Sequence, residues 1–125
     1  MRKICIAAGK ISATAVLNES PTADAVWKAL PIEGQVNTWG EEIYFDVPVH
    51  MSEESGAQAE VEMGNLAYWP PGNAFCIFFG RTPASRGDQI RAASAVNVFG
   101  QIEGDAGVFK GIGDGTPIRV SSAQA

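Results

Sequence analysis

Glycine and proline divide this chain into short segments. Fourteen glycines and seven prolines are spread over 125 residues, and apolar stretches of only a few residues lie between them. This spacing is typical of an all-β domain, in which brief strands alternate with tight turns. A chain of this length corresponds to one domain rather than two. We therefore predict a single, mainly β domain over residues 1–125.

The apolar segments alternate in the way that strands do. Ile4, Ile6 and Ala8 alternate with smaller residues, and a second strand over 11–17 follows Gly9-Lys10, so the two are expected to form a hairpin. Further strands are expected in 35–47 (two strands joined near Gly40), 60–63, 66–69, 73–79, 94–102 and 117–121. About eight strands predict a closed β-barrel. Because such a barrel fills its own interior, a ligand site is expected on an outer face or at a rim.

One or two short helices should cap the barrel. Ser20 can cap a helix that begins at Pro21 and ends before Pro31. The apolar residues between them recur at helical spacing: Ala23, Val26, Trp27 and Leu30. A second, short helix is expected over 105–110.

Charge and hydropathy exclude several classes of partner. The formal net charge of −5 disfavours nucleic acid and anionic membrane surfaces. No stretch approaches the roughly 20 apolar residues that span a bilayer, and the apolar run after Met1 is too short for a signal peptide. Cys5 and Cys76 both lie among apolar neighbours, which favours two buried free thiols. We expect a cytoplasmic protein.

Several longer motifs carry a family resemblance. They are 94–104 (Ser-Ala-Val-Asn-Val-Phe-Gly-Gln-Ile-Glu-Gly), 37–45 (Asn-Thr-Trp-Gly-Glu-Glu-Ile-Tyr-Phe), 68–78 (Tyr-Trp-Pro-Pro-Gly-Asn-Ala-Phe-Cys-Ile-Phe) and 78–83 (Phe-Phe-Gly-Arg-Thr-Pro). The first resembles the C-terminal third of a cyclophilin. Together they resemble a small family of uncharacterised bacterial or archaeal proteins with a cyclophilin-like β-barrel, and this resemblance covers nearly the whole chain. The resemblance implies that fold and no known activity.

The chain departs from cyclophilins where their catalysis resides. Cyclophilins isomerise the peptide bond before proline, using an arginine on the strand after the first helix and an apolar pocket for the proline ring. Here the matching segment is 36–39, and no arginine or lysine occurs anywhere from 31 to 80. Val96 takes the place of a groove histidine. We therefore do not expect ordinary peptidyl-prolyl isomerase activity.

The set of polar and aromatic residues that most suggests a ligand site lies around Glu42. In a strand, Glu42 and Tyr44 share one face, whereas Ile43 and Phe45 share the other, core-facing one. With Trp39 nearby, this face could recognise a cationic or amide-bearing ligand; equally, Glu42 could accept hydrogen bonds from a turn. The resemblance adds the other strands of the groove, so the predicted ligand-binding residues are Trp39, Glu42, Tyr44, Cys76, Phe78 and Val96.

Other candidate sites have simpler interpretations. His50, the only histidine, precedes the polar loop 48–58 and is expected on the surface. His50, Cys5 and Cys76 are not spaced in the sequence as metal ligands usually are, so no metal or cofactor is predicted. The glycine-rich segment 111–115 is interpreted as a turn, because a phosphate loop needs a strand before it and a helix after it.

Several polar residues of strands and loops also have structural interpretations. Asn37 and Asn97 are interpreted as buried amides that satisfy strand ends. Arg81, Arg86 and Arg91 are interpreted as charges of a solvated loop.

Three function classes follow. The first is a non-catalytic barrel that binds a small molecule or an extended peptide on its outer face. The second is an enzyme: a weak or atypical prolyl isomerase, or a carboxylate-dependent amide- or lactam-processing enzyme or its subunit, with Glu42 as the acting residue. The third is an interaction protein, such as a homodimer, with Trp39, Tyr68 or Trp69 as an anchor.

Overall fold

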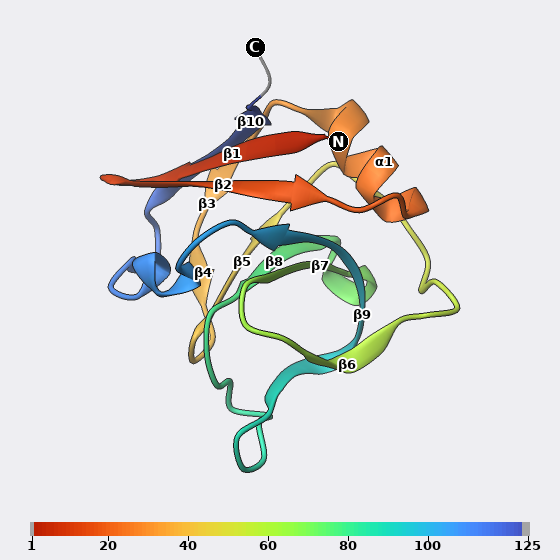
Figure 1. The fold of residues 1–125 in the computed structure, drawn as a ribbon, viewed down its shortest axis with the longest axis vertical. Coiled ribbons are helices and arrows are strands. Elements are labelled where there is room, and N and C mark those ends of the chain that lie inside the picture. The colour runs from red at the N-terminus through yellow and green to blue at the C-terminus, as the bar shows by residue number, and fades with distance from the viewer. Residues whose placement is uncertain (1, 124–125) are drawn as a thin grey trace.

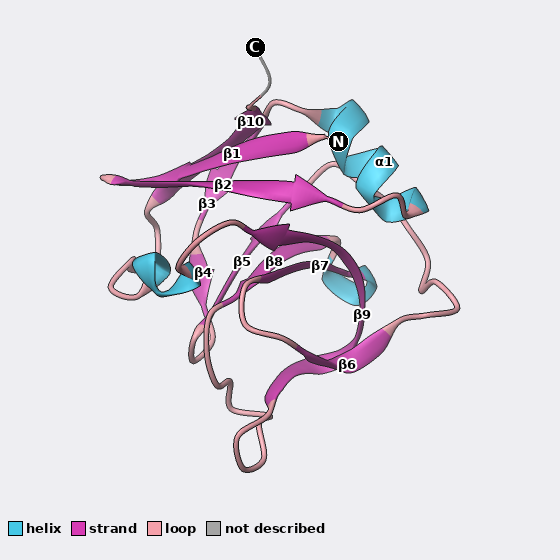
Figure 2. Ribbon diagram, viewed as in Figure 1, coloured by secondary structure: helices cyan, strands magenta, loops and turns pink. Residues whose placement is uncertain are grey.

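The structure is a computed structural model that describes residues 2–123. It consists mainly of strands, with one α-helix and two short 3-10 helices (Figures 1 and 2). The elements are β1 (Lys3–Ala8), β2 (Ile11–Leu17), α1 (Pro21–Ala29), β3 (Ile32–Gln35), β4 (Asn37–Thr38), β5 (Glu42–Asp46), β6 (Gln58–Val61), β7 (Asn65–Trp69), η1 (Pro70–Gly72), β8 (Ala74–Phe78), β9 (Ile90–Ile102), η2 (Ala106–Phe109) and β10 (Pro117–Ser122). The expected mainly β class is confirmed.

The strands form one curled sheet in the order β3-β10-β1-β2-β9-β7-β8-β5-β4, and β6 adds to β9. The hydrogen-bonded path therefore has two ends, and the expected closed barrel is wrong in this respect. Its end strands, β3 and β4, are consecutive segments of the chain with only Val36 between them. The ladder is interrupted there because β3 pairs with β10, whereas β4 pairs with β5.

The N-terminal hairpin is as expected, and β10 extends it on the other side of β1. Side chains of alternate residues point into the curled sheet, where Ile4 and Ile6 are fully buried. Aromatic rings fill the centre. Phe45 stacks on Phe75 with ring centroids 4.8 Å apart, and Phe99 meets Phe75 edge-on at 5.0 Å.

Helix α1 has the predicted ends. The Ser20 side chain accepts a hydrogen bond from the Ala23 amide at 3.1 Å, and Pro21 occupies the first turn. Its apolar face packs on the core through Ala23 and Val26, whereas Trp27 is half-buried with the Arg2 guanidinium over its ring. No helix among residues 2–123 has the length and apolar character to cross a bilayer.

The polar loop between β5 and β6 is held by a buried network. Asn97 of β9 accepts a hydrogen bond from the Glu54 amide at 2.8 Å and donates to the Ser52 carbonyl at 2.9 Å. Thr22 of α1 receives a third bond from Asn97 and donates to the Glu54 carboxylate. The loop is therefore fastened to α1 and β9. Asn97 is buried as expected, although it satisfies the loop and α1 rather than a strand end. The expectation of burial is wrong for Asn37, which is exposed.

Candidate functional site

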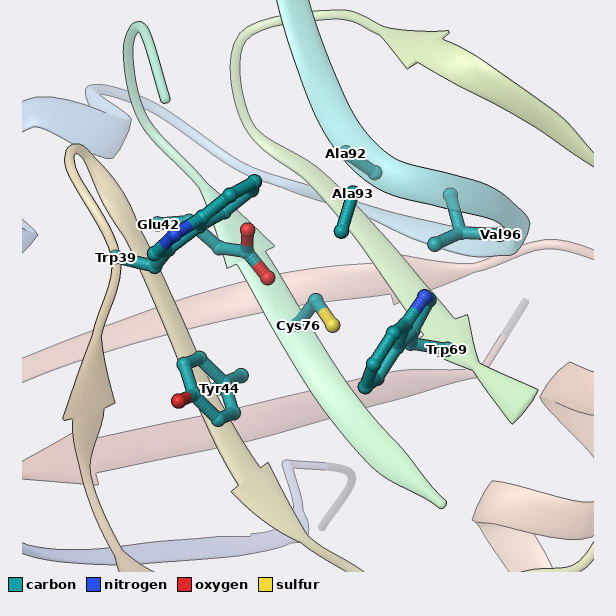
Figure 3. Close-up of a pocket in the computed structure, with 8 residues that line it drawn as sticks. All are labelled: Trp39, Glu42, Tyr44, Trp69, Cys76, Ala92, Ala93 and Val96. Carbon is teal, nitrogen blue, oxygen red and sulfur yellow. The ribbon is translucent and has the colours of Figure 1, made fainter. Parts of the chain in front are cut away.

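A groove opens on the outer face of the sheet, between the β4–β5 turn and strand β9. It encloses about 280 Å³. Strands β5, β7, β8 and β9 form it, and Figure 3 shows its walls and floor. The residues that line it are Trp39, Glu42, Tyr44, Trp69, Cys76, Ala92, Ala93 and Val96.

Strand alternation and register place these side chains together. Within β5, Ile43 and Phe45 point into the core, so Glu42 and Tyr44 point outward. Tyr44 pairs directly with Cys76 of β8. The groove therefore lies over a second apolar cluster, separate from the main core, that includes Cys76 and Val96.

Trp39 and Trp69 flank the groove from opposite sides (Figure 3). The Trp69 indole N–H donates to Ser94 Oγ at 2.7 Å, which fixes one edge of the ring. The ring also packs against Gly72, where a Cβ atom would lie 2.8 Å from the indole. Trp69 is therefore held in one orientation before any ligand binds.

The β4–β5 turn positions Trp39. The Trp39 amide donates to the Glu42 carbonyl at 3.0 Å, and Gly40 adopts a left-handed conformation with φ of 63°. A Cβ atom at Gly40 would lie 2.9 Å from the Arg81 carbonyl oxygen, so this turn packs tightly on the segment after β8. Only glycine fits here without strain.

Glu42 is the one acidic residue of the groove, and it is only 6% exposed. Burial raises the pKa of its carboxyl group from 4.5 to about 7, and hydrogen bonding with the Cys76 side chain offsets part of this rise. Burial also raises the pKa of the Cys76 thiol, and the neighbouring Glu42 charge adds to the effect. At neutral pH the groove therefore holds a protonated thiol and a carboxyl group near its midpoint of titration.

The described residues offer little other chemistry here. No arginine, lysine or histidine is among the lining residues of the groove. Residues 2–123 contain no group of three or more His, Cys, Asp or Glu side chains arranged to hold a metal ion. A thiol whose pKa is raised is a poor nucleophile. The groove can hold an apolar or aromatic ligand, and the Glu42 carboxyl group can exchange one proton with it.

The model of the cyclophilin-like family matches residues 2–121 of this chain. The chain belongs to the cyclophilin-like family. Its structure is similar to the solution structure of a hypothetical protein from Archaeoglobus fulgidus, with 39% sequence identity and a TM-score of 0.82. That similarity covers 98% of this chain and 95% of the archaeal one. No curated protein gives a significant match.

In this cyclophilin-like domain, five of the six predicted site residues line the groove together: Trp39, Glu42, Tyr44, Cys76 and Val96. Phe78 does not line it. Phe78 shares the outward face of β8 with Cys76, but it is fully buried in the second cluster with Val61 and Ala92.

Three lining residues were missed by the sequence analysis. Trp69 was expected at the end of the strand 66–69 and as an interface anchor, not as a ligand contact. Alternation along β7 places it on the face opposite to the buried Leu66 and Tyr68. Ala92 and Ala93 precede the strand expected over 94–102, whereas β9 begins at Ile90. The alternation of 66–69 could have revealed Trp69. Nothing in the charged segment 81–91 signals the early start of β9.

The remaining candidates lie away from the groove. His50 is exposed, as expected. Both cysteines are free, but Cys5 is half-buried on β1 rather than fully buried. The segment 111–115 forms turns, and Thr38 donates two hydrogen bonds to its Asp114 carboxylate at 2.7 and 2.8 Å. Arg81 and Arg86 are exposed loop residues, as predicted, but the same expectation for Arg91 is wrong, because Arg91 is half-buried in β9.

Proposed function

We propose that this protein binds a small organic molecule or a short extended peptide in the groove, without transforming it chemically. One observation carries the proposal: a preformed groove with two indole walls has a single buried carboxyl group on its floor. Mostly apolar concave sites with a few placed polar groups are the usual form of ligand pockets. Because the hydrogen bond to Ser94 already fixes the Trp69 ring, less side-chain entropy is lost when a ligand binds.

The groove chemistry supports binding rather than isomerisation. Twisting an amide before proline is stabilised in cyclophilins by an arginine, and no cation lines this groove. The protonated Cys76 thiol provides no ready nucleophile. The two free cysteines fit a reducing compartment, and we propose that the protein acts in the cytoplasm.

Amide NMR titration tests this proposal. The probes are a short Ala-Pro peptide and a panel of small neutral and charged metabolites, and exchange spectra of the peptide report isomerisation in the same tube. We expect shifts at Trp39, Glu42 and Cys76 with at least one probe, and no acceleration of cis–trans exchange. Accelerated exchange would identify an unorthodox isomerase. A protein whose groove signals move with no probe at all would contradict the proposal.

A second candidate is a carboxylate-dependent amide- or lactam-processing enzyme. It is favoured by the pKa of Glu42 near 7, which suits a general acid or base at neutral pH. A panel of simple amides and lactams tests it, with Glu42→Gln as the inactivating variant and Glu41→Gln as control. Turnover that survives Glu42→Gln would exclude this candidate.

A third possibility from the sequence, a homodimer through this face, makes a separate prediction. Burying the groove in a dimer would make ligand binding and self-association compete. Light scattering gives the mass directly. A monomer at the concentrations of the titration supports the binding groove, whereas a dimer that dissociates on ligand addition supports the interface.

A further inference from the structure

We propose that the groove selects an organic cation, held as an alkylated ammonium group between the aromatic rings with Glu42 as its counter-ion. This inference rests on the proposed ligand-binding function and names the ligand class. It follows from the electrostatic state of Glu42, the arrangement of the rings and the absence of any positive charge at the site.

Glu42 has no cationic partner among the residues that the structure describes. Residues 2–123 form five ion pairs, and none of them includes Glu42. Its neighbour in sequence, Glu41, pairs instead with Lys110 at 3.6 Å and does not line the groove. A buried carboxylate is costly unless it is paired. A ligand that brings a positive charge would supply the missing partner.

Three aromatic side chains line the groove that holds this carboxyl group. Figure 3 shows Trp39 and Trp69 on opposite sides of the space above Glu42 and Cys76, with Tyr44 on a further side. Aromatic faces attract cations through their quadrupole, tryptophan most strongly, and the attraction grows when the cation is desolvated. A groove that combines three rings with a single carboxyl group is therefore suited to an ammonium group whose alkyl substituents contact the rings.

Two of these aromatic residues also have free polar atoms. The Trp39 indole N–H and the Tyr44 hydroxyl make no hydrogen bond with residues 2–123. Both are available to a polar arm of the ligand. The volume of about 280 Å³ lies just below the range of about 300–1,000 Å³ for drug-sized ligands. A small head group therefore fits the groove.

Few titratable groups face Glu42, so a change in ligand affinity near pH 7 can be assigned to its carboxyl group. Cys76 faces it from β8 and Tyr44 lies on its own strand, while β7 and β9 contribute only Trp69, Ala92, Ala93 and Val96. Cys76 is the only side chain that shifts the pKa of Glu42 apart from burial itself. A bound cation favours the ionised carboxyl group, so binding should release a proton near pH 7.

The test uses choline and its uncharged carbon isostere dimethylbutanol, titrated by calorimetry into the full chain at about pH 8, where Glu42 is ionised. We expect choline to bind at least about tenfold more tightly than the isostere. Glu42→Gln should remove this preference, and Glu41→Gln should retain it. Below pH 7 the affinity for choline should fall by up to about tenfold per pH unit, while that for the isostere stays constant.

The outcomes separate this inference from the function on which it rests. Equal affinities for choline and the isostere would overturn the inference that the ligand is a cation, and the groove would remain a binding site. The same holds if neither probe binds but the peptide or a neutral metabolite shifts the groove signals. If no probe binds, both the cation inference and the proposed ligand-binding function are overturned. A preference for choline that Glu42→Gln leaves intact would place the cation at another site and also overturn the inference.

Discussion

The Glu42 carboxyl group and the Cys76 thiol face each other on the outer side of the sheet, from the adjacent strands β5 and β8. The register pairs Tyr44 with Cys76 and Glu42 with Phe78, so the two groups are diagonal neighbours. Burial raises the pKa of both groups. The Glu42 charge raises the pKa of Cys76 further, whereas hydrogen bonding with Cys76 lowers that of Glu42. This pair gives the groove measurable properties even before a ligand is known.

Replacing Glu42 by glutamine should stabilise the protein at alkaline pH. The folded state holds the Glu42 proton more tightly than the unfolded chain does, with a pKa of about 7 against 4.5. The stabilisation by that proton is complete below pH 4.5 and is lost as pH rises to about 7. At 1.36 kcal/mol per unit, the loss amounts to about 3 kcal/mol.

Urea unfolding at several pH values measures this effect. The free energy of unfolding of the natural protein should decrease from acid to neutral pH relative to Glu42→Gln, and the two should converge near pH 4. Glu41→Gln removes an exposed carboxyl group and should follow the natural protein. Identical pH profiles for Glu42→Gln and the natural protein would show that Glu42 titrates normally.

The Cys76 thiol should react slowly with thiol reagents. Burial and the adjacent Glu42 charge both raise its pKa, so little thiolate forms at about pH 8. In a Cys5→Ser background, we expect labelling at least about tenfold slower than in the unfolded chain. Adding Glu42→Gln removes the charge and should accelerate labelling. An unchanged rate would mean that burial alone controls the thiol.

Replacing Asn97 by alanine should destabilise the fold without involving the groove. The buried Asn97 amide makes three hydrogen bonds, to Thr22, Ser52 and Glu54. Losing them leaves backbone groups of the loop unsatisfied, and we expect about 2–3 kcal/mol lower free energy of unfolding. Asn37→Ala is the matched control, since Asn37 is exposed and makes one long bond of 3.4 Å. Equal losses for both variants would argue against the network.

Replacing Gly40 by alanine should disturb the wall of the groove. The left-handed backbone and the 2.9 Å approach of a Cβ atom to the Arg81 carbonyl together predict a loss of at least about 1–2 kcal/mol. Ligand affinity should fall as well, because Trp39 precedes this turn. In the control Gly113→Ala, nothing lies within 4 Å of the new Cβ atom. Both stability and affinity are read by thermal unfolding with and without ligand.

Local chemistry made part of this structure predictable. The helix ends at Ser20, Pro21 and Pro31 depend on neighbours within a few residues, and they are found as expected. Alternation along 42–45 placed Glu42 and Tyr44 on one face for the same reason. The family resemblance then connected this strand with Cys76 and Val96, so most of the groove was foreseen. Such features need no knowledge of distant contacts.

Tertiary structure decided the rest, because the deciding contacts join residues far apart in the sequence. Phe78 shares the outward face of β8 with Cys76, but packing with Val61 and Ala92 buries it and removes it from the groove. Alternation turns Trp69 outward, but the Ser94 hydroxyl, 25 residues away, fixes the orientation of its indole. The sheet has two ends because β3 and β4 choose different partners. Alternation alone thus determined which side chains face outward, whereas burial by distant strands determined the pKa of Glu42 and hence the character of the site.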